Sequence, residues 1–92
     1  MKENQIQKVM NHVVTIENRK KIMLTGIIEV ISSTDKTVIA KTQTHLIYIN
    51  GEILRIGKLN LEDNVLIVDG EINDLRYVVK NKSKNFFKRL IK

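Results

Sequence analysis

Apolar and polar residues alternate in short runs along most of this chain, as they do in β-strands with one buried face. The first runs cover residues 13–16, 21–32 and 37–44, and polar or turn-forming stretches separate them. Further alternating runs lie on both sides of residues 50–51 and begin again at residue 65. Short strands with this regular polar punctuation predict a small β-sandwich or, as an alternative, a small β-barrel.

The dipeptide Asn50-Gly51 lies between two apolar stretches. It suits a type I′ turn, because both central residues of that turn need a positive φ. We therefore expect a hairpin with Asn50-Gly51 at its tip and four residues on its core face. Those four residues are Ile47, Ile49, Leu54 and Ile56.

Two other glycines interrupt the predicted strands. Gly26 divides residues 21–32 and predicts a bend or a bulge there. Asp69-Gly70 could form a second tight hairpin, but Leu66, Val68, Gly70 and Ile72 keep one alternating phase across it. We favour a continuous strand in which Gly70 is a bulge or a point of close approach.

Composition supports the β class. The 92 residues make one domain and include 14 isoleucines, 9 valines and 6 threonines, but only one alanine. Branching at Cβ costs side-chain freedom in a helix and suits a pleated surface. No proline is present to exclude a strand. We expect an all-β domain over residues 13–79, preceded by a polar segment over residues 1–12.

The positive charge is concentrated at the C-terminus. Seven basic residues and no acidic residue lie between Arg76 and Lys92, whereas residues 1–75 hold nine basic and ten acidic residues. The pI of about 9.7 is therefore a property of the tail and not of the β domain. We define residues 80–92 as a basic tail.

This tail is amphipathic if it is helical. On a helical wheel Phe86, Phe87, Leu90 and Ile91 share one side, the basic residues take the other, and Ser83 suits an N-cap. Such a segment can lie on an anionic membrane, dock on a partner protein, pack on the domain or stay disordered. The candidate contact residues for a membrane or partner are Phe86, Phe87, Lys88, Arg89, Leu90 and Ile91.

Motifs for catalysis, cofactors or metals are absent from the sequence. His12 and His45 are far apart, no cysteine is present, and the serines and glycines form neither a nucleophile elbow nor a phosphate loop. We therefore expect no enzyme activity, no cofactor and no metal site. The longest apolar runs are four residues and no signal peptide is evident, so we expect a cytoplasmic location.

Nucleic-acid binding is the alternative function for a small basic barrel. Such barrels combine aromatic stacking platforms with a basic groove. The domain contains only Tyr48 and Tyr77 as aromatic residues and carries a slight negative charge. Any binding would depend on contacts between the tail and phosphates. We do not expect nucleic acid to be the main partner.

Residues 18–77 resemble the YabP/YqfC family of sporulation proteins, and more closely its YabP branch. The resemblance begins at Asn18-Arg19-Lys20 and at Leu24-Thr25-Gly26-Ile27 with Val30. It continues through the family's G-x-L-x-I-x-G-x-x-L-x-I-x-x-L run, matched here by Ile47, Ile49, Gly51, Leu54, Ile56 and Leu59. It ends at Val68, Gly70, Ile72, Leu75 and Tyr77. Two residues depart from the family pattern, because His45 and Asn64 stand where glycines are usual.

The resemblance implies a non-enzymatic protein that acts in endospore formation. It implies an immunoglobulin-like sandwich, a location in the mother cell near the forespore membrane, and assembly of outer spore layers such as the coat. Other sporulation proteins are then the expected partners. An open sandwich without edge prolines also predicts a homo-oligomer formed through a sheet edge.

Overall fold

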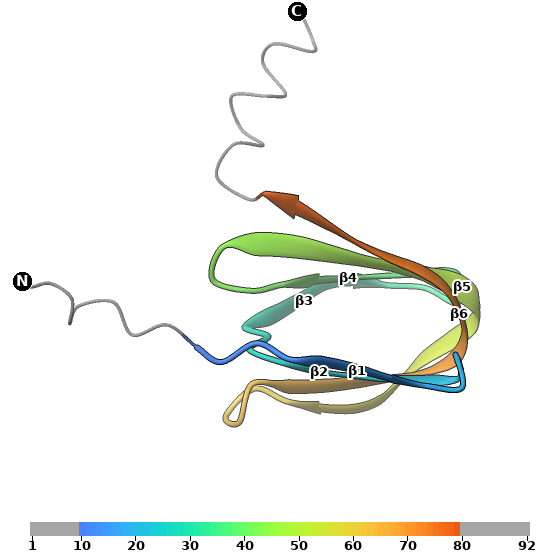
Figure 1. The fold of residues 1–92 in the computed structure, drawn as a ribbon, viewed down its shortest axis with the longest axis horizontal. Helices are drawn as coiled ribbons and strands as arrows, with labels where there is room; N and C mark the ends of the chain where they lie inside the picture. Colours follow the sequence, from blue (N-terminus) through green and yellow to red (C-terminus); the bar gives the residue numbers. More distant parts are fainter. Residues whose placement is uncertain (1–9, 80–92) are drawn as a thin grey trace, which may run out of the picture.

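The computed structural model describes residues 10–79, which form one antiparallel β-sheet of six strands and no helix (Figure 1). The strand order is β1-β2-β6-β5-β4-β3, and the two end strands do not pair with each other. The strands are β1 (Val14–Glu17), β2 (Lys21–Thr25), β3 (Glu29–Ser33), β4 (Thr37–Lys41), β5 (His45–Asn60) and β6 (Val65–Val79). The expectation of an all-β protein is confirmed.

The two long central strands fold the sheet into two layers. β5 has 16 residues and β6 has 15, and both bend sharply near their middle (Figure 1). Their halves therefore belong to different layers: β3 and β4 lie beside the first half of β5, and β1 and β2 lie beside the first half of β6. Register shifts at Asn50/Gly51, Glu52/Arg55 and Ile56/Lys58 mark the bulges along the bend.

Glycines allow β5 and β6 to cross closely at the bend. Gly70 has a φ of 136°, and a Cβ atom there would lie 2.8 Å from the Cα of Leu54. A Cβ atom at Gly51 would collide with the carbonyl oxygen of Glu71. Our expectation of a continuous strand with Gly70 at a close approach is confirmed, because β6 runs through this residue.

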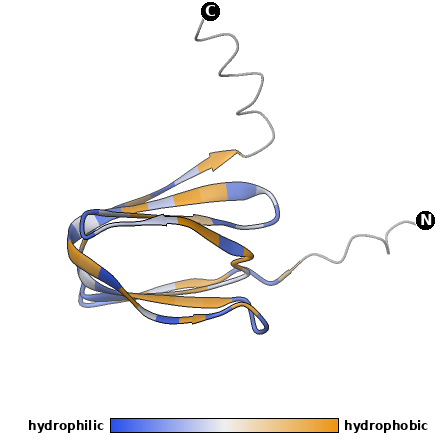
Figure 2. Cartoon of the chain, turned by 180° about the vertical axis from the view of Figure 1, so that it is seen from behind, coloured by the Kyte–Doolittle hydropathy of each residue, from blue (hydrophilic) through white to orange (hydrophobic). Residues whose placement is uncertain are grey.

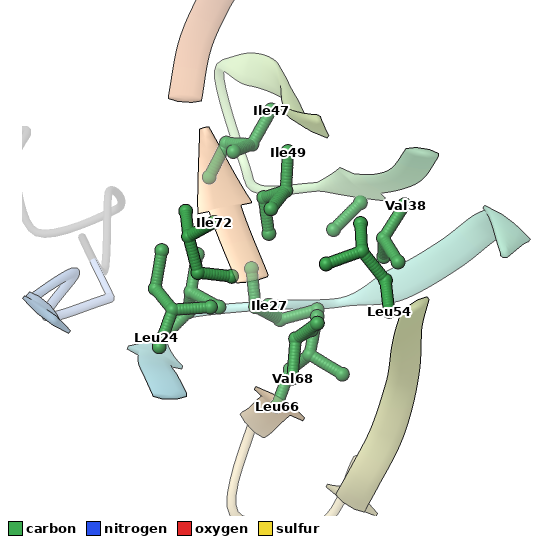
Figure 3. Packing of buried hydrophobic residues seen from close by; sticks show 11 residues of the cluster. Leu24, Ile27, Val38, Ile47, Ile49, Leu54, Leu66, Val68 and Ile72 are labelled. Carbon is green, nitrogen blue, oxygen red and sulfur yellow. The ribbon is translucent and has the colours of Figure 1, made fainter. Parts of the chain in front are cut away.

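The core lies between the two layers. Figure 2 shows apolar stretches on the strands of both layers, and Figure 3 shows their side chains pointing toward one another. Burying each large aliphatic side chain contributes about 1.5–3 kcal/mol. The cluster consists of Ile22, Leu24, Ile27, Val38, Ala40, Ile47, Ile49, Leu54, Leu66, Val68 and Ile72.

The predicted hairpin at Asn50-Gly51 is wrong. β5 continues through both residues, and the backbone N–H of Gly51 donates to the carbonyl oxygen of Lys36 at 3.0 Å. Both halves of β5 pair with the following strand β6, and this pairing along the whole strand prevails over the local turn signal. A hairpin turn at Asn50-Gly51 would break the continuous pairing of β5 with β6.

Most residues of the predicted core face are nevertheless buried. Ile47, Ile49 and Leu54 are buried, while Ile56 is half-buried and packs against the cluster. The bulge at Ile53 adds one residue to β5 and shifts its alternation, so that Leu54 faces inward after Gly51. A hairpin and a bulged strand therefore bury the same side chains.

Other predicted elements need smaller corrections. Residues 21–32 form two strands, β2 and β3, that pair with different neighbours, and Gly26 lies between them with a φ of 77°. The bend at Gly26 is therefore correct, but the single strand is not. β4 ends at Lys41, earlier than the expected residue 44, because Thr42 begins a tight turn.

Two expectations lie outside the described residues. They are the structure of residues 1–9 in the polar segment and that of the basic tail, with its contact residues Phe86, Phe87, Lys88, Arg89, Leu90 and Ile91. Over residues 10–79 we find no helix long and apolar enough to cross a membrane.

Candidate functional site

Two histidines flank Tyr77 at the open end of the sheet. His12 precedes β1, His45 begins β5, and Tyr77 lies near the end of β6, directly opposite Ile47. The ring centroid of Tyr77 lies 5.7 Å from that of His12 and 5.8 Å from that of His45. Both contacts are edge-to-face, at 82° and 87°. This geometry is favourable for aromatic pairs and holds three separate segments together.

Hydrogen bonds determine the tautomer of His12. Its Nδ1 lies 2.7 Å from the carbonyl oxygen of Thr25, which can only accept, so Nδ1 carries the hydrogen. In the neutral ring Nε2 is then an acceptor, and the hydroxyl of Tyr77 donates to it at 2.9 Å. His12 therefore links the end of β2 to the end of β6. Its role here is structural.

His45 belongs to a compact turn. The backbone N–H of Thr42 donates to the carbonyl oxygen of His45 at 2.8 Å, and the N–H of His45 donates to the Thr42 hydroxyl oxygen at 3.0 Å. The Thr44 hydroxyl lies 2.8 Å from Nδ1 of His45. The turn closes fully, although a histidine replaces the glycine that is usual in the family at this position.

A small cavity of about 170 Å³ lies beside these rings. Pockets for drug-sized ligands usually measure about 300–1,000 Å³, so this one suits a few water molecules rather than a substrate. Its lining mixes polar and aromatic side chains from both chain ends of the domain. The lining residues are Met10, His12, Gly26, Thr42, Gln43, Thr44, His45 and Tyr77.

Sequence reasoning missed this cluster. His12 and Tyr77 are 65 residues apart, and no local pattern indicates that they meet. Within residues 10–79 no group of three or more histidine, cysteine or acidic side chains could hold a metal ion. The two histidines lie near one tyrosine, and His12 already uses both of its ring nitrogens in hydrogen bonds.

Acidic side chains take part in polar contacts at a turn and on the surface. Asn60 and Asp63 are joined by a side-chain hydrogen bond of 3.2 Å that closes the turn between β5 and β6. On the opposite side of the domain, an exposed Lys36–Glu52 pair lies at 2.7 Å. The hydrogen bond from Lys36 to Glu52, followed by the charge of that carboxylate, raises the pKa of Lys36 above its usual range. This lysine therefore stays protonated.

The outer face of the first layer carries two polar contacts between β5 and β6. The guanidinium carbon of Arg76 lies 5.4 Å from the ring centroid of Tyr48, and the side-chain amide of Asn50 donates to Asp74 at 2.9 Å. Arg76 thus covers one face of Tyr48, and Tyr77 is engaged by the two histidines. The nucleic-acid alternative gains no support here, because neither tyrosine forms part of a basic stacking groove.

Together these features define a small all-β protein with a strongly bent antiparallel sheet and a cluster of aromatic and histidine side chains at its open end. The family model described as the YabP family matches residues 8–84. The chain therefore belongs to the YabP family, and the resemblance recognised in the sequence is confirmed.

A curated relative agrees with this assignment. The chain is similar to the protein named "Spore protein YabP" of Bacillus subtilis (strain 168). The two are 27% identical over 84 residues, which cover 88% of this chain and 84% of the relative. These comparisons suggest a role in sporulation.

The second departure from the family pattern also has a structural explanation. Asn64 has a φ of 59°, in the left-handed region that asparagine tolerates better than most residues. Its side-chain amide donates to the carbonyl oxygen of Ile27 at 3.1 Å, and its own carbonyl oxygen accepts from the N–H of Ile27. Asparagine thus keeps the turn geometry of a glycine and adds a link to the segment between β2 and β3.

Proposed function

We propose that this protein is a non-enzymatic assembly or scaffold component in endospore formation, which helps to build the outer layers of the spore from the mother-cell side. The observation that carries this proposal is membership of the YabP family over residues 8–84, together with the relative named as a spore protein. The matched positions are mostly apolar residues and glycines that build the bent sheet. Residues of these types build a scaffold and supply no catalytic group.

The chemistry near Tyr77 supports a non-catalytic role. His12 is held by Thr25 and Tyr77, so neither of its ring nitrogens is available to move a substrate proton without breaking a structural bond. The adjoining cavity, of about 170 Å³, is smaller than the pockets that hold drug-sized ligands. In this proposal the protein functions through surfaces that contact other molecules and not through a ligand pocket.

The basic tail supplies a second contact in this proposal. On a helical wheel Phe86 and Phe87 share one apolar side with Leu90 and Ile91, and Lys88 and Arg89 lie on either side of it. A basic residue near an anionic membrane adds about 1 kcal/mol of attraction, and the phenylalanines can enter the interface. We place this contact at the forespore membrane, with a sporulation protein as the alternative docking partner.

Flotation with liposomes tests the tail contact. The full chain should float with anionic vesicles, and a chain ending at Asn81 should stay with the protein fraction. The double variant Phe86→Ser, Phe87→Ser retains every basic residue and should float less than the full chain, because the apolar side is lost. Equal behaviour of the full and shortened chains with anionic lipid would contradict the membrane contact.

The role in spore formation is tested by deleting the gene and counting heat- and lysozyme-resistant spores. A loss of resistance with normal vegetative growth is expected, and expression of the intact chain should restore it. Fully resistant spores with a normal coat in the deletion strain would contradict the proposal. The chain ending at Asn81 separates the contribution of the β domain from that of the tail.

A further inference from the structure

The bent sheet exposes four strand edges rather than two. β1 and β3 end the sheet, as in any open sheet. In addition, β6 pairs with β2 only from Val65 to Asp69, and β5 pairs with β4 only from Leu46 to Asn50. Within residues 10–79, the later parts of β5 and β6 therefore have a neighbouring strand on one side only.

The turns of the domain cover the start of these two additional edges. The N–H groups of Gly70 and Ile72 donate to the carbonyl oxygens of Lys20 and Arg19, and the N–H of Leu54 donates to that of Asp35. Beyond these residues the described part of the chain provides no second partner strand. The free edges are residues 55–60 of β5 and residues 73–79 of β6. We call residues 73–79 the β6 edge.

Charge and regularity distinguish the β6 edge from the other three. β1 is only four residues long, and a register shift interrupts β3. The free part of β5 contains a register shift at Gly57 and carries only positive charges, Arg55 and Lys58. These are the features that discourage edge pairing. A register shift at Asn73 marks the start of the β6 edge, and residues 74–79 beyond it form the longest uninterrupted stretch of the four edges. The β6 edge is also the only one of the four that carries charges of both signs.

Asp74 and Arg76 on this edge are arranged to match a second copy. They are two residues apart, so their side chains share the outer face, where they lie opposite Asn50 and Tyr48 of β5. Both are exposed, and among residues 10–79 neither takes part in an ion pair. Tyr77 and Val79 add apolar surface on the other face, with 46% and 43% of their area exposed.

We propose that two copies of this chain pair antiparallel through the β6 edge, centred on Leu75, with Asp74 of each copy opposite Arg76 of the other. This inference deepens the proposed assembly role, because it names the first contact between subunits. A two-fold axis in an antiparallel ladder pairs residues whose numbers add to an even total. Centring on Leu75 gives two opposite-charge pairs, whereas centring on Asp74 or Arg76 places like charges opposite each other.

The ladder has a defined length. It runs from Asp74 to Arg76 in each copy, because Asn73 is the extra residue at the register shift and Arg19 already occupies the edge at Ile72. Pairing extends the sheet across both molecules and satisfies backbone groups that have no strand partner among residues 10–79. The contact is short, and we expect a dimer that forms and dissociates readily.

Cysteine crosslinking tests the register, because the chain contains no cysteine. In the proposed dimer the two copies of residue 75 lie directly opposite, with Cα atoms about 4.5–5.5 Å apart, which a disulfide can span. Leu75→Cys should therefore form a dimer on mild oxidation. Tyr77→Cys should not, since its two copies would be about 13 Å apart. Ile31→Cys on β3 is the control for random edge contacts.

Charge exchange tests the same contact without changing Leu75, which packs against the core. By sedimentation, Asp74→Arg and Arg76→Asp should each weaken dimerisation roughly tenfold, and the double exchange should restore it. Arg55→Asp on β5 is the matched control and should have no effect. A strict monomer at high micromolar concentration, crosslinking preferentially at residue 31 or 77, or failure of the double exchange to restore the dimer would overturn the proposal. These experiments use purified protein, so their failure is separate from any failure of the sporulation role.

Discussion

Gly70 of β6 lies against Leu54 of β5 so closely that a Cβ atom at residue 70 would stand 2.8 Å from the Cα of Leu54. The backbone of Gly70 also has a φ of 136°, which side-chain-bearing residues rarely adopt. This crossing lies where the sheet turns from one layer to the other, so the close approach holds the bend.

Gly70→Ala should therefore destabilise the fold by at least about 2 kcal/mol, because the added methyl group meets backbone and the conformation is strained. Denaturant unfolding followed by circular dichroism measures the change. Gly57→Ala is the control, since a Cβ atom there comes too close only to the carboxylate of Asp69, which can rotate away, and makes an ordinary contact with Ile67. Similar effects at the two positions would show that the crossing at Gly70 is not tight.

Ile49 reports on the core between the layers. It is fully buried, so Ile49→Ala should cost about 2–5 kcal/mol through lost burial and the cavity that remains. The exposed Ile16→Ala on β1 should change stability far less. A loss below about 0.5 kcal/mol at Ile49 would place this face of β5 outside the core.

Ile53 is a position where substitution should stabilise the protein. Its φ is 53°, and 70% of its surface is exposed, so a β-branched side chain bears backbone strain without much burial. Ile53→Asn should raise the unfolding free energy by about 0.5–1 kcal/mol, because asparagine tolerates the left-handed region. Ile53→Val keeps the branching and should leave stability nearly unchanged. A destabilising Ile53→Asn would indicate that this side chain packs in solution.

The same residue explains what sequence reasoning could and could not predict. Alternation and β-branched composition predict the strands and the core positions Ile47 and Ile49, whereas the core position of Leu54 follows only from the predicted hairpin. The path of the chain does not follow, because the local Asn50-Gly51 signal competes with pairing along the whole of β5 and β6, which joins residues as far apart as His45 and Val79. The extra residue at Ile53 shifts the alternation of β5 by one position, so that Leu54 faces inward. The wrong hairpin and the observed bulged strand therefore bury mostly the same residues.

The cluster around Tyr77 could not be predicted for a different reason. His12, His45 and Tyr77 come from three segments, and only the bend and pairing of the whole sheet bring them together. The continuous strand through Gly70 could be predicted, because Gly70 keeps the alternating phase of Leu66, Val68 and Ile72 in the sequence. Local alternation of apolar and polar residues predicts individual strands. Contacts between the two layers can be predicted only when the order and pairing of the strands are known.

Tyr77→Phe tests the link across the open end. Loss of the hydrogen bond to Nε2 of His12 should reduce stability by about 0.5–1.5 kcal/mol. His12→Ala alone and the double variant complete a double-mutant cycle, which isolates the coupling between the two side chains. Additive effects in that cycle would mean that the two groups do not interact in solution.

The role in building the spore is tested most directly by the position of a fluorescent fusion in sporulating cells. We predict a ring around the forespore, formed from the mother-cell side, which becomes weaker or diffuse when the chain ends at Asn81. Signal over the nucleoid, or an even distribution throughout both compartments during spore formation, would contradict the assembly role.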